Sequence, residues 1–352
     1  MMIKKWVSKI RGERMIKTAL AVFFTVLICR FFELPPAFAV IAAVVTLEPT
    51  AADSVQKGLQ RFPATLIGTA LSLGSLFVFG QSAVAFTLAA VLTIYICYKL
   101  RLEAGILVAT LTAVLMIPVA EAPYLIEFIQ RAGTTLIGIS VSTIVNLTIL
   151  PPHFSRMVAE KNDVLFSQAG RLLLEKIAEI VETGESKNYT RKRFSDMQRQ
   201  LSASIELISH QKKEWKYHRC SDRDMMFFTY QKEQLYALER IIYHTHSLFM
   251  LNDDHFTLFP EKQEVVNRAA HSIANVLEQK SRNITEAHYQ IIEQLDYTFR
   301  QVQLEWPETN ESAYHHHFSG EVIILYVLLS IHDVLEELEK IHTQYEKDTS
   351  GF

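Results

Sequence analysis

The chain has 352 residues, of which 49% are hydrophobic, and a formal net charge of -3 at pH 7. This average hides two different halves: residues 1–150 carry 12 Lys+Arg against 7 Asp+Glu, a net of +5, and residues 151–352 carry 23 against 31, a net of -8. The acidic second half, which holds all 13 histidines, argues against a nucleic-acid partner, because phosphates demand a basic surface. We therefore expect a domain boundary near Pro151-Pro152.

Six apolar segments follow one another in the first half, at 15–33, 35–49, 62–80, 82–98, 104–120 and 132–150. Several are nearly uncharged over the length that a helix needs to cross a ~30 Å hydrocarbon core. The alternative, buried helices of a large soluble protein, would require each segment to be apolar on all sides. Ala37-Phe38-Ala39 resembles a signal-peptide cleavage site, but apolar sequence resumes directly after it. We predict a basic segment at 1–14 and a six-helix transmembrane domain at 15–150.

The positive charges predict the orientation of these helices, because cytoplasmic loops carry an excess of Lys and Arg. The N-terminal segment is basic, and the loops that would share its side of the membrane hold Lys57, Arg61, Lys99, Arg101, Arg156 and Lys161. The opposite loops contain Glu33, the uncharged Gly80-Gln81-Ser82, and Glu121 with Glu127. Both termini are therefore predicted to be cytoplasmic, and Arg30 and Arg131 depart from the pattern.

One stretch occurs twice: QRFPATLIGTALS at 60–72 and QRAGTTLIGISVS at 130–142 share Gln, Arg, Thr, Leu, Ile, Gly and Ser at an offset of 70 residues. The offset spans three predicted crossings, so the second unit of three helices is expected to be inverted relative to the first. Three-plus-three inverted repeats are common in transporters, with the pathway at their interface. The alternative is chance, since apolar helices use a small alphabet of residues.

Small residues four apart in both copies predict close helix packing; they are Ala64, Gly68 and Ser72, and Thr134, Gly138 and Ser142. The second and fifth helices are expected to be less regular. The second begins at Pro35-Pro36 and the fifth ends at Pro118. Short or proline-limited helices at corresponding positions of two repeats point to a substrate path.

The stretch TLEPTAADSVQKGLQRFPATLIGTALS, from Thr46 to Ser72, resembles the signature of the aromatic acid exporter superfamily. That group includes the fusaric-acid-resistance-like proteins and, more distantly, the plant aluminium-activated malate transporters. The second copy, Arg131 to Pro152 with its Asn146, is similar to the six-helix bacillar branch, which has a C-terminal helical domain. The resemblance implies a multi-pass plasma-membrane protein that exports aromatic or other organic anions. The matching signature residues are Pro49, Thr50, Ser54, Gly58, Arg61 and Gly68, with Ala64 where the signature has glycine.

The second half, 151–352, has helical periodicity without strand alternation, with helices expected at 154–184, 190–218, 222–251, 261–282, 285–304 and 319–346. Apolar stripes such as Leu235, Leu238, Ile241, Ile242 and Leu248 predict a cytoplasmic helical bundle. The fold class is thus all-α: six transmembrane helices as two inverted repeats, followed by this bundle. The bundle is expected to mediate homo-oligomer contacts or gating.

No catalytic or metal motif is evident in the sequence. GxSxG, Walker and HExxH patterns are missing, so we expect no enzyme, no cofactor and no nucleotide-driven step. His315-His316-His317 and His244-x-His246 lack a helical face in common and partners at ligand spacing, which favours a polar loop over a metal site. Cys29, Cys97 and Cys220 have no CxxC spacing, which predicts neither a disulfide framework nor a zinc site.

Arg61 and Arg131 are the candidate substrate contacts. Each is expected at the beginning of a membrane helix, where a guanidinium can fork onto a carboxylate and free amides reinforce it. Thr50, Ser54 and Thr134 are expected to offer hydroxyl donors. The alternative is that each arginine snorkels to a lipid headgroup or pairs locally, Arg61 with Glu48 or Asp53 and Arg131 with Glu127.

Together these features predict an exporter or channel for aromatic or other organic acid anions in the cell membrane. Its two arginines are expected near opposite faces of the membrane, one at each end of the path. The alternative function is a non-transporting membrane scaffold or sensor that acts through its cytoplasmic helical domain.

Overall fold

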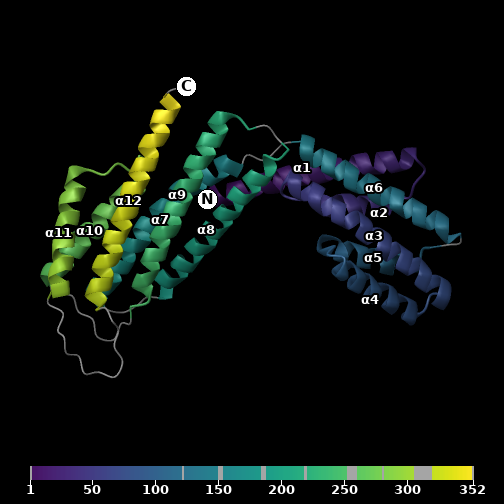
Figure 1. Cartoon of the computed structure of the whole chain (residues 1–352), viewed down its shortest axis with the longest axis horizontal. Coiled ribbons are helices and arrows are strands. Elements are labelled where there is room, and N and C mark those ends of the chain that lie inside the picture. The colour runs from purple at the N-terminus through teal and green to yellow at the C-terminus, as the bar shows by residue number, and fades with distance from the viewer. Residues whose placement is uncertain are drawn as a thin grey trace, which may run out of the picture. The chain divides into compact units, whose positions relative to one another are not determined.

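The computed structural model of the chain describes residues 2–120, 123–149, 154–183, 188–217, 220–251, 260–279, 281–304 and 319–350, without the side chains of 2–11, 13, 182, 183 and 188. Over these residues the chain folds into helices and contains no strand, which confirms the all-α class (Figure 1). The chain divides into two compact units. Unit 1 comprises Met1–Pro152 and Lys212–Arg219, and unit 2 comprises His153–Gln211 and Cys220–Phe352.

Each predicted apolar segment of the first half overlaps a helix of unit 1. These helices are α1 (Met2–Phe31), α2 (Pro36–Thr46), α3 (Ala51–Phe79), α4 (Ala83–Lys99), α5 (Ile106–Met116) and α6 (Tyr124–Thr148), with the 3-10 turn η1 (Glu103–Gly105) directly before α5. Unit 1 also includes the segment 212–219, where the Glu214 carboxylate accepts a 3.0 Å hydrogen bond from the amide of Ala51 at the start of α3.

The predicted starts of α3 and α6 were wrong. Helix α3 begins at Ala51 rather than at 62, because the Thr50 side chain caps it by accepting a 3.0 Å hydrogen bond from the Asp53 amide. Helix α6 begins at Tyr124 rather than at 132. Arg61 and Arg131 therefore lie inside these helices, beyond the first turn. The free amides of a helix start cannot reinforce them, because amides beyond the first turn bond to the preceding carbonyls.

Close packing in unit 1 follows the 70-residue offset of the sequence repeat. A Cβ atom on Gly68 of α3 would overlap the carbonyl oxygen of Ala109 on α5, and one on Gly138 of α6 would overlap that of Ala39 on α2. Both residues of the first contact correspond to residues of the second at an offset of 70. The helix pairs correspond too: α3 packs on α4 and α5, α6 packs on α1 and α2, and α3 packs on α6.

The exterior of unit 1 is apolar and its interior is lined by small residues. Phe31, Phe77, Leu107 and Leu125 are each at least 70% exposed and come from four different helices. The buried positions are instead mostly Ala, Gly, Ser and Thr. This distribution is typical of helices that pack closely within lipid, where apolar side chains face the acyl chains.

Two helices, α3 and α6, are long and apolar enough to cross a membrane. Helices α2 and α4 and the η1–α5 segment are apolar but shorter. At eleven residues each, α2 and α5 are roughly 16 Å long at 1.5 Å per residue, less than a ~30 Å hydrocarbon core. The two short helices thus occupy the corresponding positions predicted for them, whereas the six crossings stay a prediction.

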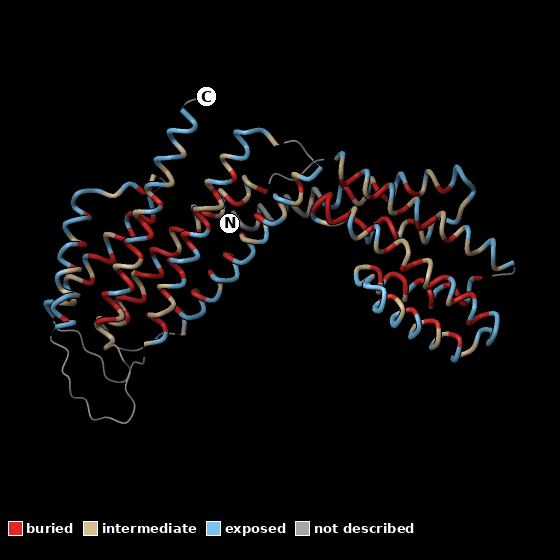
Figure 2. Tube along the Cα trace, viewed as in Figure 1, coloured by how far each residue is buried: buried red, intermediate tan, exposed pale blue. Residues whose placement is uncertain are grey.

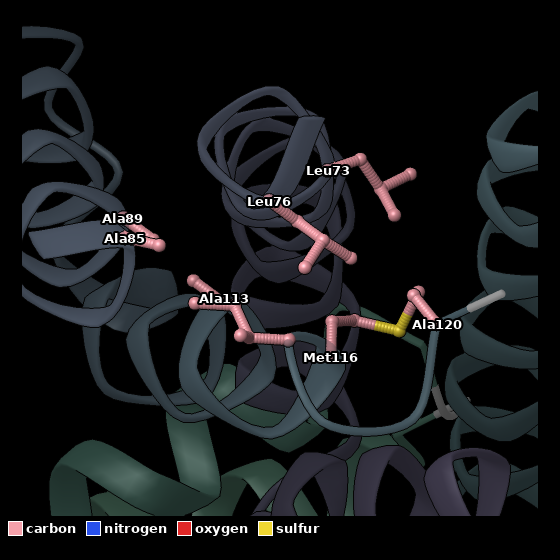
Figure 3. Packing of buried hydrophobic residues seen from close by; sticks show 8 residues of the cluster. Leu73, Leu76, Ala85, Ala89, Ala113, Met116 and Ala120 are labelled. Carbon is pink, nitrogen blue, oxygen red and sulfur yellow. The ribbon is translucent and has the colours of Figure 1, made fainter. Parts of the chain in front are cut away.

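An apolar cluster holds α3, α4 and α5 together. Figure 3 shows Leu76 of α3 above Ala113 and Met116 of α5, with Ala85 and Ala89 of α4 on one side of α3 and Leu73 pointing to the other side. The alanines let α4 approach closely, and the leucines fill the remaining space. Packing rather than polar bonding therefore holds this part of unit 1.

Unit 2 is a helical bundle whose helices are close to the predicted ranges. They are α7 (Phe154–Ala178), continued by the π-helix η2 (Glu179–Thr183), α8 (Asn188–Glu214), α9 (Asp222–Phe249), α10 (Pro260–Glu278), α11 (Glu286–Leu304) and α12 (Gly320–Ser350). The last three residues of α8 belong to unit 1. Buried residues form stripes along these helices (Figure 2). Helix α7 packs on α9 and α10, and α12 packs on α9, α10 and α11. The predicted stripe of Leu235, Leu238, Ile241, Ile242 and Leu248 is buried on α9.

Candidate functional site

Arg131 of α6 is buried within unit 1, with only 4% of its surface exposed. Its Nη2 donates a 2.5 Å hydrogen bond to Thr112 Oγ1, and its guanidinium carbon lies 3.6 Å from the centre of the Phe38 ring. Nε and Nη1 have no hydrogen-bond partner among the described residues. A buried guanidinium with two unused donors is costly unless something pairs with it.

The two contacts of Arg131 come from the two short helices. Phe38 lies in the first turn of α2, where Pro36 begins the helix with a φ that suits its first position. Thr112 lies in α5, the helix that corresponds to α2 at the 70-residue offset. Arg131 therefore contacts both helices that the sequence marked as pointers to a substrate path.

Arg61 of α3 is fully engaged by comparison. Its Nη2 pairs with Glu48 Oε1 at 2.7 Å, its Nη1 donates to the Val45 carbonyl at 2.9 Å, and its Nε donates to the Ala104 carbonyl at 3.1 Å. Glu48 also pairs with Lys57 at 2.9 Å. The local-pair alternative thus describes the geometry of Arg61, through Glu48.

The two arginines differ because their surroundings differ at corresponding positions. Seventy residues after Glu48 the sequence has Pro118, which offers no charge. The described residues contain no ion pair between Arg131 and Glu127, the pair considered from the sequence, and Asp53 pairs with Lys213 at 2.9 Å instead of with Arg61. Arg61 is thus neutralised within the protein, and Arg131 has no such counterion in the described residues.

Thr50 and Ser54 belong to a polar cluster around Asn146 of α6. The Asn146 amide nitrogen donates to Ser54 Oγ at 2.8 Å and to the Thr50 carbonyl at 3.1 Å, and its oxygen accepts from Lys17 Nζ at 2.9 Å. Thr50 Oγ1 donates to Asp53, and Ser54 Oγ donates to the Thr46 carbonyl. Both hydroxyl donors are therefore occupied by the protein itself.

Thr134 lies next to Arg131 in sequence, and its Oγ1 donates to the Arg131 carbonyl at 3.1 Å. The structure therefore does not bring the three predicted hydroxyl donors together with both arginines. Buried hydroxyls that have no hydrogen-bond partner in the described residues occur elsewhere: Ser72 on α3 and Ser142 and Thr135 on α6. Ser72 and Ser142 are again related by the 70-residue offset.

Reasoning from the sequence missed Phe38, Thr112 and Lys17 as neighbours of the candidate residues, and treated Asn146 only as a family match. Asn146 could have been found as the single amide within the apolar part of α6. Thr112 and Phe38 carry no such signal, because threonine and phenylalanine are ordinary residues of a membrane helix.

The described residues contain no cluster of three or more His, Cys, Asp or Glu side chains that could hold a metal ion. His246 stacks on Phe194 at 5.3 Å between ring centres, whereas His244 lies edge-on to Tyr326 at 6.3 Å. These two histidines thus have separate aromatic neighbours. His315-His316-His317 lies outside the described residues.

Comparison with known proteins gives a consistent result. The sequence profile described as aromatic acid exporter family member 1 matches residues 9–149. A UPF0421 protein of Bacillus cereus is 42% identical over 97% of this chain and 97% of its own length. A UPF0421 protein of Halalkalibacterium halodurans is 33% identical over 94% and 89%, and one of Staphylococcus epidermidis is 40% identical over 62% and 67%.

The family profile covers the part of the chain that holds α1–α6, and the relatives from Bacillus cereus and Halalkalibacterium halodurans match most of unit 2 as well. The apolar exterior of unit 1 and the apolar helices α3 and α6 agree with a membrane protein. The chain therefore belongs to the aromatic acid exporter family, among the proteins named UPF0421.

Proposed function

We propose that this protein moves aromatic or other organic carboxylate anions across the cell membrane, with Arg131 as the principal anion contact. The observation that carries the proposal is the buried guanidinium of Arg131, whose Nε and Nη1 have no partner in the described residues. A carboxylate oxygen can accept a charge-assisted hydrogen bond from either of these two N–H groups, and the negative charge of the anion neutralises the guanidinium. Family membership supports the same substrate class.

An aromatic carboxylate suits the surroundings of Arg131 better than a small inorganic anion. The Phe38 ring already lies against one face of the guanidinium, and an aromatic substrate can pack against the same ring edge-on or offset. Thr112 on the other short helix holds Nη2, so the guanidinium plane is set before the anion arrives. Such preorganisation lowers the cost of binding.

The path proposed for the anion runs between two inverted three-helix repeats. The corresponding contacts Gly68–Ala109 and Gly138–Ala39 support this arrangement, as do the short helices α2 and α5. Unpartnered hydroxyls on the packed helices α3 and α6 support a polar route between them. Six crossings with both termini in the cytoplasm fit the distribution of Lys and Arg in the loops.

Arg61 takes a different part in the proposed mechanism. The Glu48 carboxylate already occupies it at 2.7 Å, so an incoming anion must displace an internal one. Arg61 would therefore hold substrate more weakly than Arg131, which favours passage over trapping. Transport draws on an ion gradient or is passive, since the sequence contains no nucleotide-binding motif.

The test is flux of labelled 4-hydroxybenzoate through the full chain reconstituted in liposomes. Arg131→Gln is expected to lower the flux about tenfold or more, the loss that one charge-assisted hydrogen bond produces. Arg30→Gln is the matched control, because Arg30 is an exposed arginine at the end of α1. Unchanged flux in Arg131→Gln would overturn the role of Arg131. If well-folded protein transports none of the organic acids tested, the result would favour the scaffold or sensor function instead.

The topology has its own test. A single cysteine placed at Ser82, between α3 and α4, is expected to react with a membrane-impermeant maleimide from outside intact cells. A cysteine at Lys57 is expected to react only after the membrane is opened. Labelling of the Lys57 position from outside would contradict the proposed six crossings and cytoplasmic termini.

A further inference from the structure

A groove lies between α10 and α11 of unit 2, which run side by side (Figure 1). Its volume is about 430 Å³, within the range of small-molecule sites. Helix α10 contributes residues from one face, spaced three or four apart, and α11 contributes its first turns. Gln279, Asn283 and Thr285, which lie between the two helices, complete the lining.

The lining of the groove favours an anion. Arg268, His271 and Asn275 project from successive turns of α10 and supply N–H donors, with Gln279 one turn further on. None of the described residues that line the groove carries a carboxylate, although residues 151–352 have a net charge of -8. Val276 and Ile291 add apolar wall, which an organic molecule fills better than an inorganic ion does.

Two hydrogen bonds and one longer contact to a carboxylate connect the side chains behind the inner wall. Ser272 Oγ lies 2.7 Å from His288 Nδ1, His288 Nε2 lies 3.1 Å from His332 Nδ1, and His332 Nε2 lies 3.6 Å from Glu336 Oε1. The Glu336 carboxylate favours a proton on His332 Nε2, which makes Nδ1 an acceptor. His288 then donates from Nε2 and accepts at Nδ1 from the Ser272 hydroxyl.

This order of donors and acceptors determines what the Ser272 hydroxyl can offer to a ligand. Its proton is committed to His288, so the oxygen can offer only lone pairs to a molecule in the groove. The groove therefore presents donors along α10 and one acceptor at Ser272. A complementary ligand carries a carboxylate for the donors and a hydroxyl for the acceptor.

We propose that the α10–α11 groove binds a small organic carboxylate that also carries a hydroxyl group. Arg268 forks onto the carboxylate, Asn275 donates to it, and Ser272 Oγ accepts from the ligand hydroxyl. The site stands on the groove alone and goes beyond the transport proposed for unit 1. A role for this site in sensing the transported anion rests on the transport proposed for unit 1.

The experiment is hydrogen exchange, read by mass spectrometry, on the full chain in lipid nanodiscs with increasing 4-hydroxybenzoate. Peptides that cover 268–291 are expected to become protected at saturation. Arg268→Gln is expected to raise the half-saturating concentration about tenfold, as for a lost charge-assisted hydrogen bond. Arg300→Gln, an exposed arginine of α11 that pairs with Asp296, is the matched control and is expected to leave it unchanged.

Three further arms separate the alternatives. Benzoate, which lacks the hydroxyl, is expected to protect the same peptides more weakly, and inorganic phosphate is expected not to protect them. Arg131→Gln is expected to retain the protection, so failure of transport and failure of this site are distinguishable. Lack of protection at 268–291, equal protection by phosphate or benzoate, or full protection in Arg268→Gln would each overturn the proposal.

Discussion

Lowering the pH from 7 to 5 is expected to destabilise the α10–α11–α12 part of unit 2 by about 2 kcal/mol through His288. This side chain is 1% exposed and bonds to Ser272 on α10 and His332 on α12. Burial, followed by the charge of His332, lowers the pKa of His288 from 6.5 to about 4. At a pH between these two pKa values, His288 binds a proton in the unfolded chain but not in the folded chain.

The sign follows from this difference in bound protons. A histidine whose folded pKa is depressed contributes full stability above its unfolded pKa and loses it as the pH falls from 6.5 towards 4. The complete loss is about 3 kcal/mol, since each pKa unit corresponds to about 1.4 kcal/mol. Burial also lowers the pKa of His332, against the opposing charges of Glu336 and Asp333, so the neighbouring imidazole acts in the same direction.

The assay is hydrogen exchange of the α10, α11 and α12 peptides at the two pH values, corrected for the intrinsic exchange rate. His288→Leu removes one titrating group and is expected to flatten the pH dependence. His271→Gln, which changes an exposed histidine one residue before Ser272, is the matched control and is expected to keep it. Equal or greater protection at pH 5 in the unchanged chain would refute the reasoning.

Three predictions concern unit 1. Arg131→Met is expected to abolish flux in liposomes. Its thermal unfolding midpoint is expected to stay equal or rise, because the substitution removes a buried charge without a counterion in the described residues. A lowered midpoint would indicate a structural role instead. Arg61→Met leaves Lys57 as the remaining ion-pair partner of Glu48. It is expected to destabilise unit 1 by about 1–3 kcal/mol in urea titrations in detergent. Unchanged stability would contradict a stabilising Arg61–Glu48 pair. Gly138→Ala is expected to lower the free energy of unfolding by about 1–3 kcal/mol in the same titrations. The control Gly74→Ala, with nothing within 4 Å of its added Cβ, is expected to leave it unchanged. Equal effects of the two substitutions would count against the close α6–α2 contact.

Helix type and position were readable from the sequence, because both depend on local properties of the chain. Runs of apolar residues and three-to-four spacing led to the helices of both units, and prolines marked the short α2 and α5. The starts of α3 and α6 were not readable in the same way. Their first two turns contain charged residues such as Asp53, Lys57 and Glu127, which lower the hydropathy although the helix continues through them.

The sequence by itself determined the all-helical class, the family and the repeated Gln-Arg pair at an offset of 70. Only the tertiary structure decided which of the two arginines has a carboxylate partner within the protein and which has donors left for an anion. Arg61 folds against Glu48 from the end of α2, and Arg131 folds against Phe38 and Thr112 without a counterion among the described residues. The physical reason is that the state of a buried charge depends on what folding brings to it across helices, and identical local sequence contains no record of that partner.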